Sequence, residues 1–221
     1  MFFPNFMSYV LFAGLGNPGP SYAHTRHNAG FLVVDALAAH WNVDWREERR
    51  FGCAVARKVH PARGTTVWLA KPLRYMNCSG QTLGPWMRYQ RLALEQTVVL
   101  YDEIQLPAGS LKISAKGSDG GHNGVADLLR HVGDSFTRLK LGVGPKPRDY
   151  DMKDFVLGAF SPAEWALFEK AIATGVRACT TLLDQGLLAA MNQFNRKSPT
   201  PLPELPEPTS PHHEPGNQKN L

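Results

Sequence analysis

The segment formed by residues 11–31 constrains the fold more than any other part of the chain, and it reads LFAGLGNPGPSYAHTRHNAGF. Residues 9–15 form a continuous apolar run, which is typical of a β-strand buried on both faces, and the Gly-Asn-Pro-Gly-Pro run that follows prevents its continuation. Apolar residues then recur at helical spacing over 30–41, with Asn28 as a candidate cap. Polar loops held by a strand and a helix often carry chemistry, and His27 in this loop is a candidate general base.

Later segments repeat this arrangement of a short apolar strand, a polar loop and a helix. Strands are predicted at 51–59, 65–70, 97–101, 111–115 and 136–143, and helices at 79–92, 125–132, 162–184 and 187–195. A hairpin-like connection joins the first two of these strands, so part of the sheet is expected to be antiparallel. Residues 144–154 are expected to be irregular. The pattern predicts a single α/β domain with a mixed, mostly parallel central sheet flanked by helices.

The chain has 221 residues, of which 43% are hydrophobic, and is therefore long enough for one domain with a substantial core. We expect an N-terminal extension over 1–7, the α/β domain over 8–196, and a disordered proline-rich tail over 197–221. No run reaches the roughly 18 apolar residues of a membrane span, so no membrane partner is predicted. The three cysteines lie far apart without a C-x-x-C pair, which fits a reducing cytoplasm better than a disulfide framework.

The formal net charge is +5 and the sequence pI is about 9.2. A basic balance favours an anionic partner, nucleic acid above all, although a basic solvated surface explains the same numbers. Charge alone leaves both interpretations open.

Residues 14–19 match the G-x-G-x-x-G pattern of dinucleotide-binding loops, and Asp35 follows at about the distance of a ribose-binding acid. In a dinucleotide fold the helix opens within that loop and the acid ends a second strand. Here Pro18 and Pro20 delay the helix, and Asp35 falls inside it. We therefore expect no nucleotide cofactor.

Metal and thiol chemistry are weakly supported by the spacing of the candidate groups. His24, His27 and His122 could form a zinc set, but they occupy irregular loops rather than one face of a helix. Cys78 could be a nucleophile, but no histidine lies near it in the sequence. Neither a metal nor a cysteine nucleophile is predicted.

A carboxylate partner would make His27 an effective base. The predicted strand 97–101 ends at Asp102 and Glu103, at the edge where open α/β sheets bind ligands. If Asp102 faces His27, it fixes the imidazole tautomer and stabilises the imidazolium that forms when water loses a proton. Glu103 points the other way on a strand and is expected to be exposed. On spacing alone, a structural histidine bonded to backbone is an equal alternative for His27.

Three asparagines, Asn17, Asn77 and Asn123, each lie in a loop between a strand and a helix. Carboxamides can donate hydrogen bonds to an oxyanion and accept them from a substrate amide. With a histidine and an aspartate, they indicate a hydrolytic pocket without a protein nucleophile. Tyr75 and Met76 are candidates for its walls, with ordinary core packing as the alternative.

Four stretches carry a specific resemblance, namely GLGNPGPSYAHTRHNAGF, KPLRYMNCSG, YDEIQLPAGSLKI and KGSDGGHNG. In this order they resemble the bacterial-type peptidyl-tRNA hydrolase family, from about residue 9 to residue 195. The resemblance implies a cytosolic, usually monomeric esterase. Such an enzyme cleaves the ester between the C-terminal carbonyl of a peptide and the terminal ribose of tRNA.

The resemblance also implies roles for individual residues. His27 resembles the base that activates water, Asp102 the residue that holds it in its basic form, and Asn17 the discriminator between N-blocked and free aminoacyl-tRNA. The substrate-binding residues that it implies are Tyr22, Tyr75, Asn77, Asn123, Lys112 and Lys140, and we also predict that Met76 and His122 bind substrate. The two tyrosines are expected at the tRNA end, where an aromatic ring can stack on the terminal adenine. The two lysines are expected to hold a tRNA phosphate, although the family often has arginine at the second position.

We accordingly predict that a cytoplasmic monomer hydrolyses peptidyl-tRNA without metal or cofactor. The alternative is a non-catalytic module that binds structured RNA on the same scaffold, because a basic body alone would serve that purpose. Hydrolysis of peptidyl-tRNA distinguishes the two.

Overall fold

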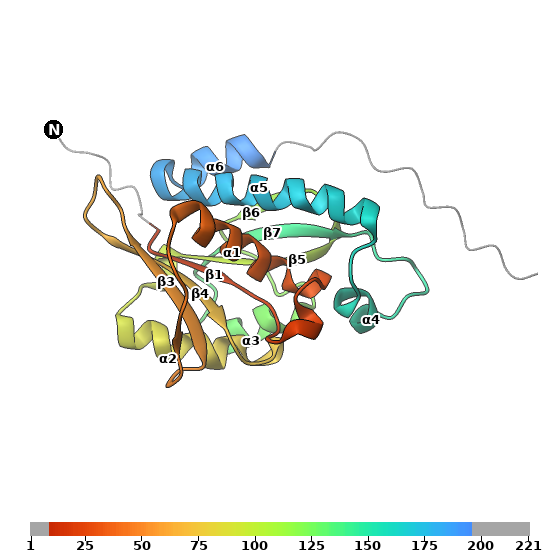
Figure 1. Cartoon of the computed structure of the whole chain (residues 1–221), viewed down its shortest axis with the longest axis horizontal. Helices are drawn as coiled ribbons and strands as arrows, with labels where there is room; N and C mark the ends of the chain where they lie inside the picture. Colours follow the sequence, from red (N-terminus) through yellow and green to blue (C-terminus); the bar gives the residue numbers. More distant parts are fainter. Residues whose placement is uncertain (1–8, 196–221) are drawn as a thin grey trace, which may run out of the picture.

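The computed structural model describes residues 9–195. The extension predicted over 1–7 and the tail predicted over 197–221 lie outside the described residues, so the domain boundaries stay a prediction. The described chain is built around a seven-stranded sheet with helices on both faces (Figure 1). No helix in this part of the chain combines the length and the apolar character that crossing a membrane requires.

The sheet is mixed, as predicted, with its parallel strands at the centre. Its strands are β1 (Leu11–Gly14), β2 (Arg46–Glu48), β3 (Cys53–Val59), β4 (Thr66–Pro72), β5 (Thr97–Pro107), β6 (Leu111–Ser114) and β7 (Thr137–Gly144), in the order β2-β3-β4-β1-β5-β7-β6. The neighbours β4, β1, β5 and β7 pair in parallel, whereas the β2-β3, β3-β4 and β6-β7 pairs are antiparallel. The carboxyl ends of the parallel strands therefore meet at one end of the sheet, where ligands bind in such folds.

Helices form a layer on each face of the sheet (Figure 1). One layer contains α1 (Ala29–Trp41), α5 (Pro162–Gln185) and α6 (Leu187–Phe194), and the other contains α2 (Ser79–Gln90) and α3 (Asn123–His131). The short helix α4 (Met152–Leu157) packs on the 3-10 turn η2 (Arg26–Asn28), which follows η1 (Pro20–Tyr22). Two further turns, η3 (Met76–Cys78) and η4 (Leu94–Gln96), precede α2 and β5.

The buried core is divided by the sheet into two clusters. Successive residues of β1 point to opposite faces, so Phe12 joins the cluster under α1 and α5, whereas Leu11 and Ala13 join the cluster under α2 and α3. These residues are 0% exposed, which explains why the sequence of β1 is apolar throughout.

Strand β5 continues further than predicted. It was expected to end before Asp102, yet its backbone pairs with β7 through Glu103 and the strand runs to Pro107. On the other side β1 ends at Gly14, opposite Leu100. Asp102 therefore extends beyond the end of β1 and faces the loop that follows it.

The sequence predicts that Asn28 caps α1. Asn28 does precede α1, but its side chain makes no capping hydrogen bond. Its Oδ1 instead accepts the Asn17 N–H at 2.8 Å, and its Nδ2 donates to the Asn17 carbonyl oxygen at 3.0 Å. Asn28 is 2% exposed, so these bonds are shielded from water. The pair ties the loop after β1 to the beginning of α1.

Gly30 allows α1 to approach the sheet closely. A Cβ atom at this position would lie 2.2 Å from the Leu100 carbonyl oxygen and 2.5 Å from the Leu15 backbone nitrogen, so only hydrogen fits there. Because Gly30 follows soon after His27 and Leu100 comes just before Asp102, this contact sets the distance between the two functional side chains.

Gly30→Ala is expected to lower the free energy of unfolding by about 1–3 kcal/mol, because the backbone atoms it meets cannot move aside as a side chain would. Gly117→Ala is the matched control, since its Cβ would meet the Arg138 side chain at 3.6 Å, an ordinary contact. The control should change stability by no more than about 0.5 kcal/mol. Urea unfolding measures both, and equal stability of the two variants would contradict the tight contact.

Candidate active site

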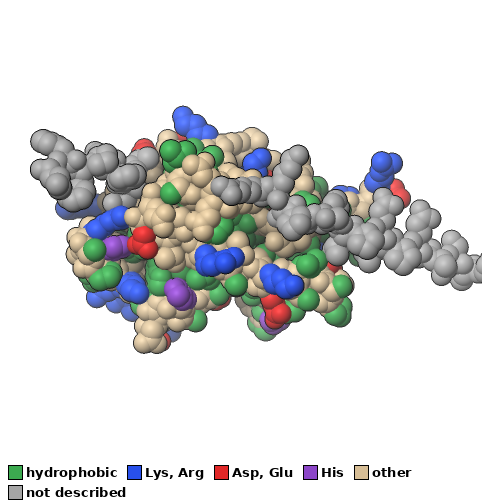
Figure 2. Space-filling model, turned by 90° about the horizontal axis from the view of Figure 1, so that it is seen from above, with side chains coloured by type: hydrophobic (Ala, Val, Ile, Leu, Met, Phe, Trp, Pro, Cys, Tyr) green, Lys and Arg blue, Asp and Glu red, His purple; other side chains and the backbone are tan. Residues whose placement is uncertain are grey.

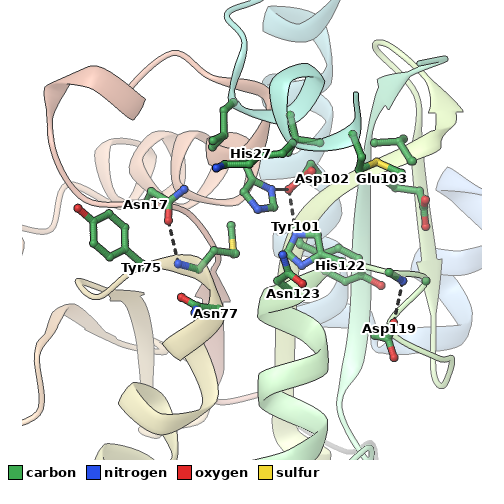
Figure 3. Close-up of a pocket in the computed structure, with 18 of the residues that line it drawn as sticks. Asn17, His27, Tyr75, Asn77, Tyr101, Asp102, Glu103, Asp119, His122 and Asn123 are labelled. Carbon is green, nitrogen blue, oxygen red and sulfur yellow. Dashed lines mark hydrogen bonds and ion pairs between the residues drawn. The ribbon is translucent and has the colours of Figure 1, made fainter. Parts of the chain in front are cut away.

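A cavity of about 640 Å³ opens at the carboxyl end of the parallel strands (Figure 3). Its walls come from the loops after β1 and β4, from β5, from the beginning of α3 and from α4. The predicted site residues that line it are Asn17, Tyr22, His27, Tyr75, Met76, Asn77, Asp102, His122 and Asn123. Lys112 and Lys140 are not part of the lining.

At the centre of the site, a buried carboxylate is held between two imidazoles (Figure 3). His27 Nδ1 and His122 Nε2 each lie 2.9 Å from the same oxygen, Asp102 Oδ1. Asp102 is 3% exposed, and His27 is 7% exposed. With Nδ1 engaged, His27 keeps Nε2 as the nitrogen that can accept a proton in the cavity. This arrangement favours a base over a structural histidine bonded to backbone.

Burial and electrostatic attraction oppose each other at this pair. Burial alone would raise the pKa of Asp102, but the two imidazoles outweigh it and hold that pKa well below its usual range. At His27, burial lowers the pKa, whereas the charge and the hydrogen bond of Asp102 raise it, and the balance lies above the ordinary value of 6.5. Asp102 is therefore ionised at neutral pH, and its charge can stabilise a positive charge on the His27 ring.

Asn17 is fixed in one orientation by two neighbouring segments. Its Oδ1 accepts the Met76 N–H at 2.8 Å, and its backbone is bonded to Asn28 as described above. The carboxamide therefore presents its NH₂ group toward the side of the cavity on which His27 lies (Figure 3). Asn17 can donate a hydrogen bond there, but its oxygen is already in use.

The other two asparagines and the tyrosines lie along the rim of the cavity. Asn77 comes from η3, and Asn123 is the first residue of α3. Tyr75 is 62% exposed, and its ring meets that of Tyr22 edge to face with centroids 6.3 Å apart. An exposed tyrosine packed against a half-buried one beside the cavity fits the stacking role that the resemblance implies.

Lys112 and Lys140 are opposite each other on the antiparallel strands β6 and β7. Lys140 Nζ lies 2.7 Å from Glu103 Oε2, and this ion pair is largely buried. Glu103 was expected to be exposed, but the lysine holds its side chain at 13% exposure. Lys112 is exposed and has the freer charge of the two lysines.

Helix α4 forms a wall that the sequence analysis missed, because residues 144–154 were expected to be irregular. Its apolar side chains Met152, Val156 and Leu157 line the cavity. The available signal was Asp151, a favoured N-cap residue whose side chain accepts the backbone N–H groups of the first turn.

Arg26, the neighbour of His27, was also missed. Its side chain is largely buried and Nη1 donates to the carbonyl oxygens of Phe155, Gly158 and Ala159. Its Nη2 donates to both carboxylate oxygens of Glu164 at 2.9 and 2.8 Å. Arg26 thereby ties the His27 turn to the end of α4 and to the first turn of α5. A basic residue within a buried turn was the only signal in the sequence.

The structure also bears on the competing chemistries. His24 packs edge-on against Trp165 rather than against His27 and His122. Three possible metal-ligand atoms, one from each of His27, Asp102 and His122, lie within 4.8 Å of one another. This spacing is close enough for all three to bind one metal ion. His122 Nδ1, however, accepts two backbone N–H groups, so its proton is on Nε2, and that nitrogen is a donor rather than a metal ligand.

Comparison with known proteins gives a consistent result. The sequence profile described as peptidyl-tRNA hydrolase matches residues 11–201. The peptidyl-tRNA hydrolase of Bacillus subtilis (strain 168) is 41% identical over 189 residues, covering 85% of this chain and 99% of that protein. That of Gloeobacter violaceus is 42% identical over 193 residues, covering 87% and 96%. A crystal structure of peptidyl-tRNA hydrolase from Acinetobacter baumannii has a TM-score of 0.82 and 33% identity, covering 90% of this chain and 100% of that one.

A buried histidine-aspartate pair that lines a cavity with three asparagines has the groups that a hydrolase needs. The chain belongs to the peptidyl-tRNA hydrolase family. It is accordingly an ester hydrolase with peptidyl-tRNA hydrolase activity, which decides against a non-catalytic RNA-binding module.

Arg26→Met is expected to lower the free energy of unfolding by about 3 kcal/mol, because it leaves a mostly buried carboxylate and three carbonyl oxygens without their donor. Glu164→Gln should cost less, since a neutral amide oxygen still accepts from the guanidinium. Urea unfolding at neutral pH compares the two. A larger loss in the glutamine variant would contradict the central position of Arg26.

The ion pair between Arg26 and Glu164 should make the stability of the protein depend on pH. Burial raises the pKa of Glu164, but its hydrogen bonds to Arg26 and Ser161 outweigh burial and place that pKa below its ordinary value of 4.5. The resulting stabilisation is complete above the unfolded-state pKa and is lost as pH falls through the folded-state pKa. Wild type should therefore lose more free energy of unfolding than Glu164→Gln between about pH 6 and pH 3.

Proposed function

We propose that His27 activates the water with which this hydrolase cleaves the ester bond of N-blocked peptidyl-tRNA. The proposal depends on one observation, the 2.9 Å contact between His27 Nδ1 and Asp102 Oδ1 at the wall of the cavity. His27 Nε2 takes a proton from water while the water oxygen bonds to the ester carbonyl carbon. The bond from that carbon to the ribose oxygen then breaks, and His27 returns the proton to the leaving ribose hydroxyl.

Asn17, in this proposal, selects the N-blocked substrate. Its oxygen is bonded to the Met76 N–H, so it offers only N–H groups to the cavity. A peptide attached to the reacting residue presents a carbonyl oxygen that can accept such a bond. A free α-ammonium group has only donors, so neither it nor the Asn17 NH₂ group finds an acceptor in the other.

The remaining cavity residues are assigned to substrate binding and to the developing charge. Asn77 and Asn123, which line the cavity, are assigned as donors to the tetrahedral oxyanion or to the ribose. Tyr22 and Tyr75 are assigned to the terminal adenine, on which they can stack, and Met76 is assigned to the cavity wall that contacts substrate. His122, which the sequence also predicts to bind substrate, lines the same cavity.

Phosphate binding is assigned to Lys112 and Lys140. On the face seen in Figure 2, basic side chains are scattered among other residue types rather than gathered. The two lysines lie opposite each other on β6 and β7, which makes them our candidate for a tRNA phosphate. Because Glu103 neutralises Lys140, Lys112 carries most of this interaction in our proposal.

By resemblance to the family, we further propose a cytoplasmic monomer that needs neither metal nor cofactor. Light scattering tests the monomer, and an assay in the presence of EDTA tests the independence from metal. Loss of turnover with EDTA and its return with a divalent cation would contradict the metal-free mechanism.

His27→Ala is expected to reduce turnover of N-acetylaminoacyl-tRNA by about 10²–10⁴-fold while tRNA binding is kept, because only the general base is removed. His24→Ala is the matched control, since this exposed histidine packs against Trp165 and is not part of the cavity lining. It should retain wild-type turnover. Near wild-type turnover by His27→Ala would refute the proposed role of this residue.

Lys112→Ala is expected to weaken tRNA binding and to reduce the slope of log K against log salt by about one, the value for one phosphate contact. Lys140→Met should reduce the slope less, because its charge is already paired with Glu103. Lys170→Ala, an exposed lysine on α5, is the control for net charge. Binding titrations at several salt concentrations measure the slopes, and equal effects of Lys112→Ala and Lys170→Ala would contradict a specific contact.

A further inference from the structure

We propose that His122 is a positioning residue of the His27–Asp102 pair, held with its proton on Nε2 by the N-terminus of α3, and not the substrate contact predicted from the sequence. The inference rests on the proposed function of His27 and Asp102. It explains why the His122 imidazole is bonded to Asp102, because a residue that only contacts substrate would not need that bond.

The tautomer of His122 follows from its hydrogen bonds. This residue is the N-cap of α3, and its Nδ1 accepts the N–H groups of Gly124 and Val125 at 3.2 and 3.3 Å. Because a backbone N–H can only donate, Nδ1 carries no proton and the ring proton lies on Nε2. Nε2 therefore donates to Asp102 Oδ1, at 2.9 Å.

The same environment opposes protonation of the ring. A proton on Nδ1 would remove both capping bonds of α3. It would also place a positive charge at the N-terminal end of a helix, where the backbone dipoles favour negative charge. At 9% exposure, the cation would have little water to stabilise it. These contacts therefore hold the ring with its proton on Nε2.

A shared acceptor couples His122 to the base. Asp102 Oδ1 accepts from His122 Nε2 and from His27 Nδ1, and the two rings are 4.9 Å apart between centroids. Each donor draws negative charge from the oxygen, so the bond from His122 moderates the stabilisation that Asp102 gives to the His27 imidazolium. His122 thus orients the carboxylate and keeps His27 unprotonated, and so able to act as a base, nearer to neutral pH.

The acidic side chains around the pair have hydrogen-bond partners other than Asp102. Tyr101, from β5, packs edge-on against the His122 ring with centroids 5.0 Å apart. The charged groups along the cavity wall are Glu103, Asp119, Asp151 and Lys153. The hydrogen bonds of the three acids go to Lys140 and to backbone N–H groups instead. His122 is therefore the group through which a change at α3 reaches Asp102.

His122→Asn separates capping from positioning. Asparagine is a favoured N-cap and can still accept from the amides of α3, but its shorter side chain does not extend to Asp102. We expect the acid limb of the pH profile of kcat/KM, measured with N-acetylaminoacyl-tRNA, to move upward by on the order of one pH unit. At the wild-type midpoint this shift reduces kcat/KM by about five-fold, KM changes little, and higher pH restores the rate.

His131→Asn is the matched control, because His131 is on the same helix and its Nδ1 contacts the Asp127 carbonyl oxygen instead of the active-site pair. It should leave the acid limb in place. An increase in KM with an unmoved acid limb in His122→Asn would identify a substrate contact. A loss of activity at every pH together with lower stability would identify a structural role only. Either result overturns the proposal.

Nitrogen-15 NMR of the imidazoles in the wild-type protein tests the tautomer without a substitution at His122. We expect the ring proton of His122 to lie on Nε2, with no proton on Nδ1. A proton on His122 Nδ1 would overturn the proposal. If His27→Ala kept its turnover, the role of His27 would fail, whereas the tautomer of His122 would still be decided by NMR, so the two failures are distinguishable.

Discussion

The close contact between the beginning of α1 and the strands β1 and β5 supports the whole site. At Gly30 the helix backbone lies against Leu15 and Leu100 at distances that no side chain would permit. His27 and Asp102 are attached to this contact within a few residues on either side, so backbone packing sets their separation. Groups that are positioned in this way need no reorientation during the reaction, which is the condition for effective electrostatic catalysis.

Two mostly buried charges depend on partners from distant parts of the chain. Asp102 lies between two imidazoles, and the Arg26 guanidinium bonds to Glu164 and to carbonyl oxygens near α4. A buried ion without such partners costs several kcal/mol. The partners belong to η2, α3, α4 and the first turn of α5, so the site is complete only when the helices have packed on the sheet. Charge compensation in this way connects the stability of the fold to the chemistry of the site.

Sequence reasoning was accurate where one local pattern has one physical explanation. The apolar run over 9–15 followed by glycine and proline predicts a buried strand and a loop, and both are present. It was wrong where distant partners decide. Asn28 bonds to Asn17 instead of capping α1, and Glu103 is held by Lys140 instead of being exposed. The local sequence around Asn28 and Glu103 is that of an ordinary helix cap and an ordinary strand end. Their side chains have other partners because folding brings Asn17 and Lys140 next to them.

The sequence by itself determined which side chains are available for hydrolysis, because the residue types and the strand-loop-helix order place His27, Asp102 and Asn17 in or beside polar loops. Only the tertiary structure decided which of them meet. The His27–Asp102 contact joins residues 75 positions apart, and it depends on β1 lying beside β5 in the sheet. The tautomer of His122 was likewise decided by folding, because a ring nitrogen becomes a donor or an acceptor only through the partners that packing brings to it.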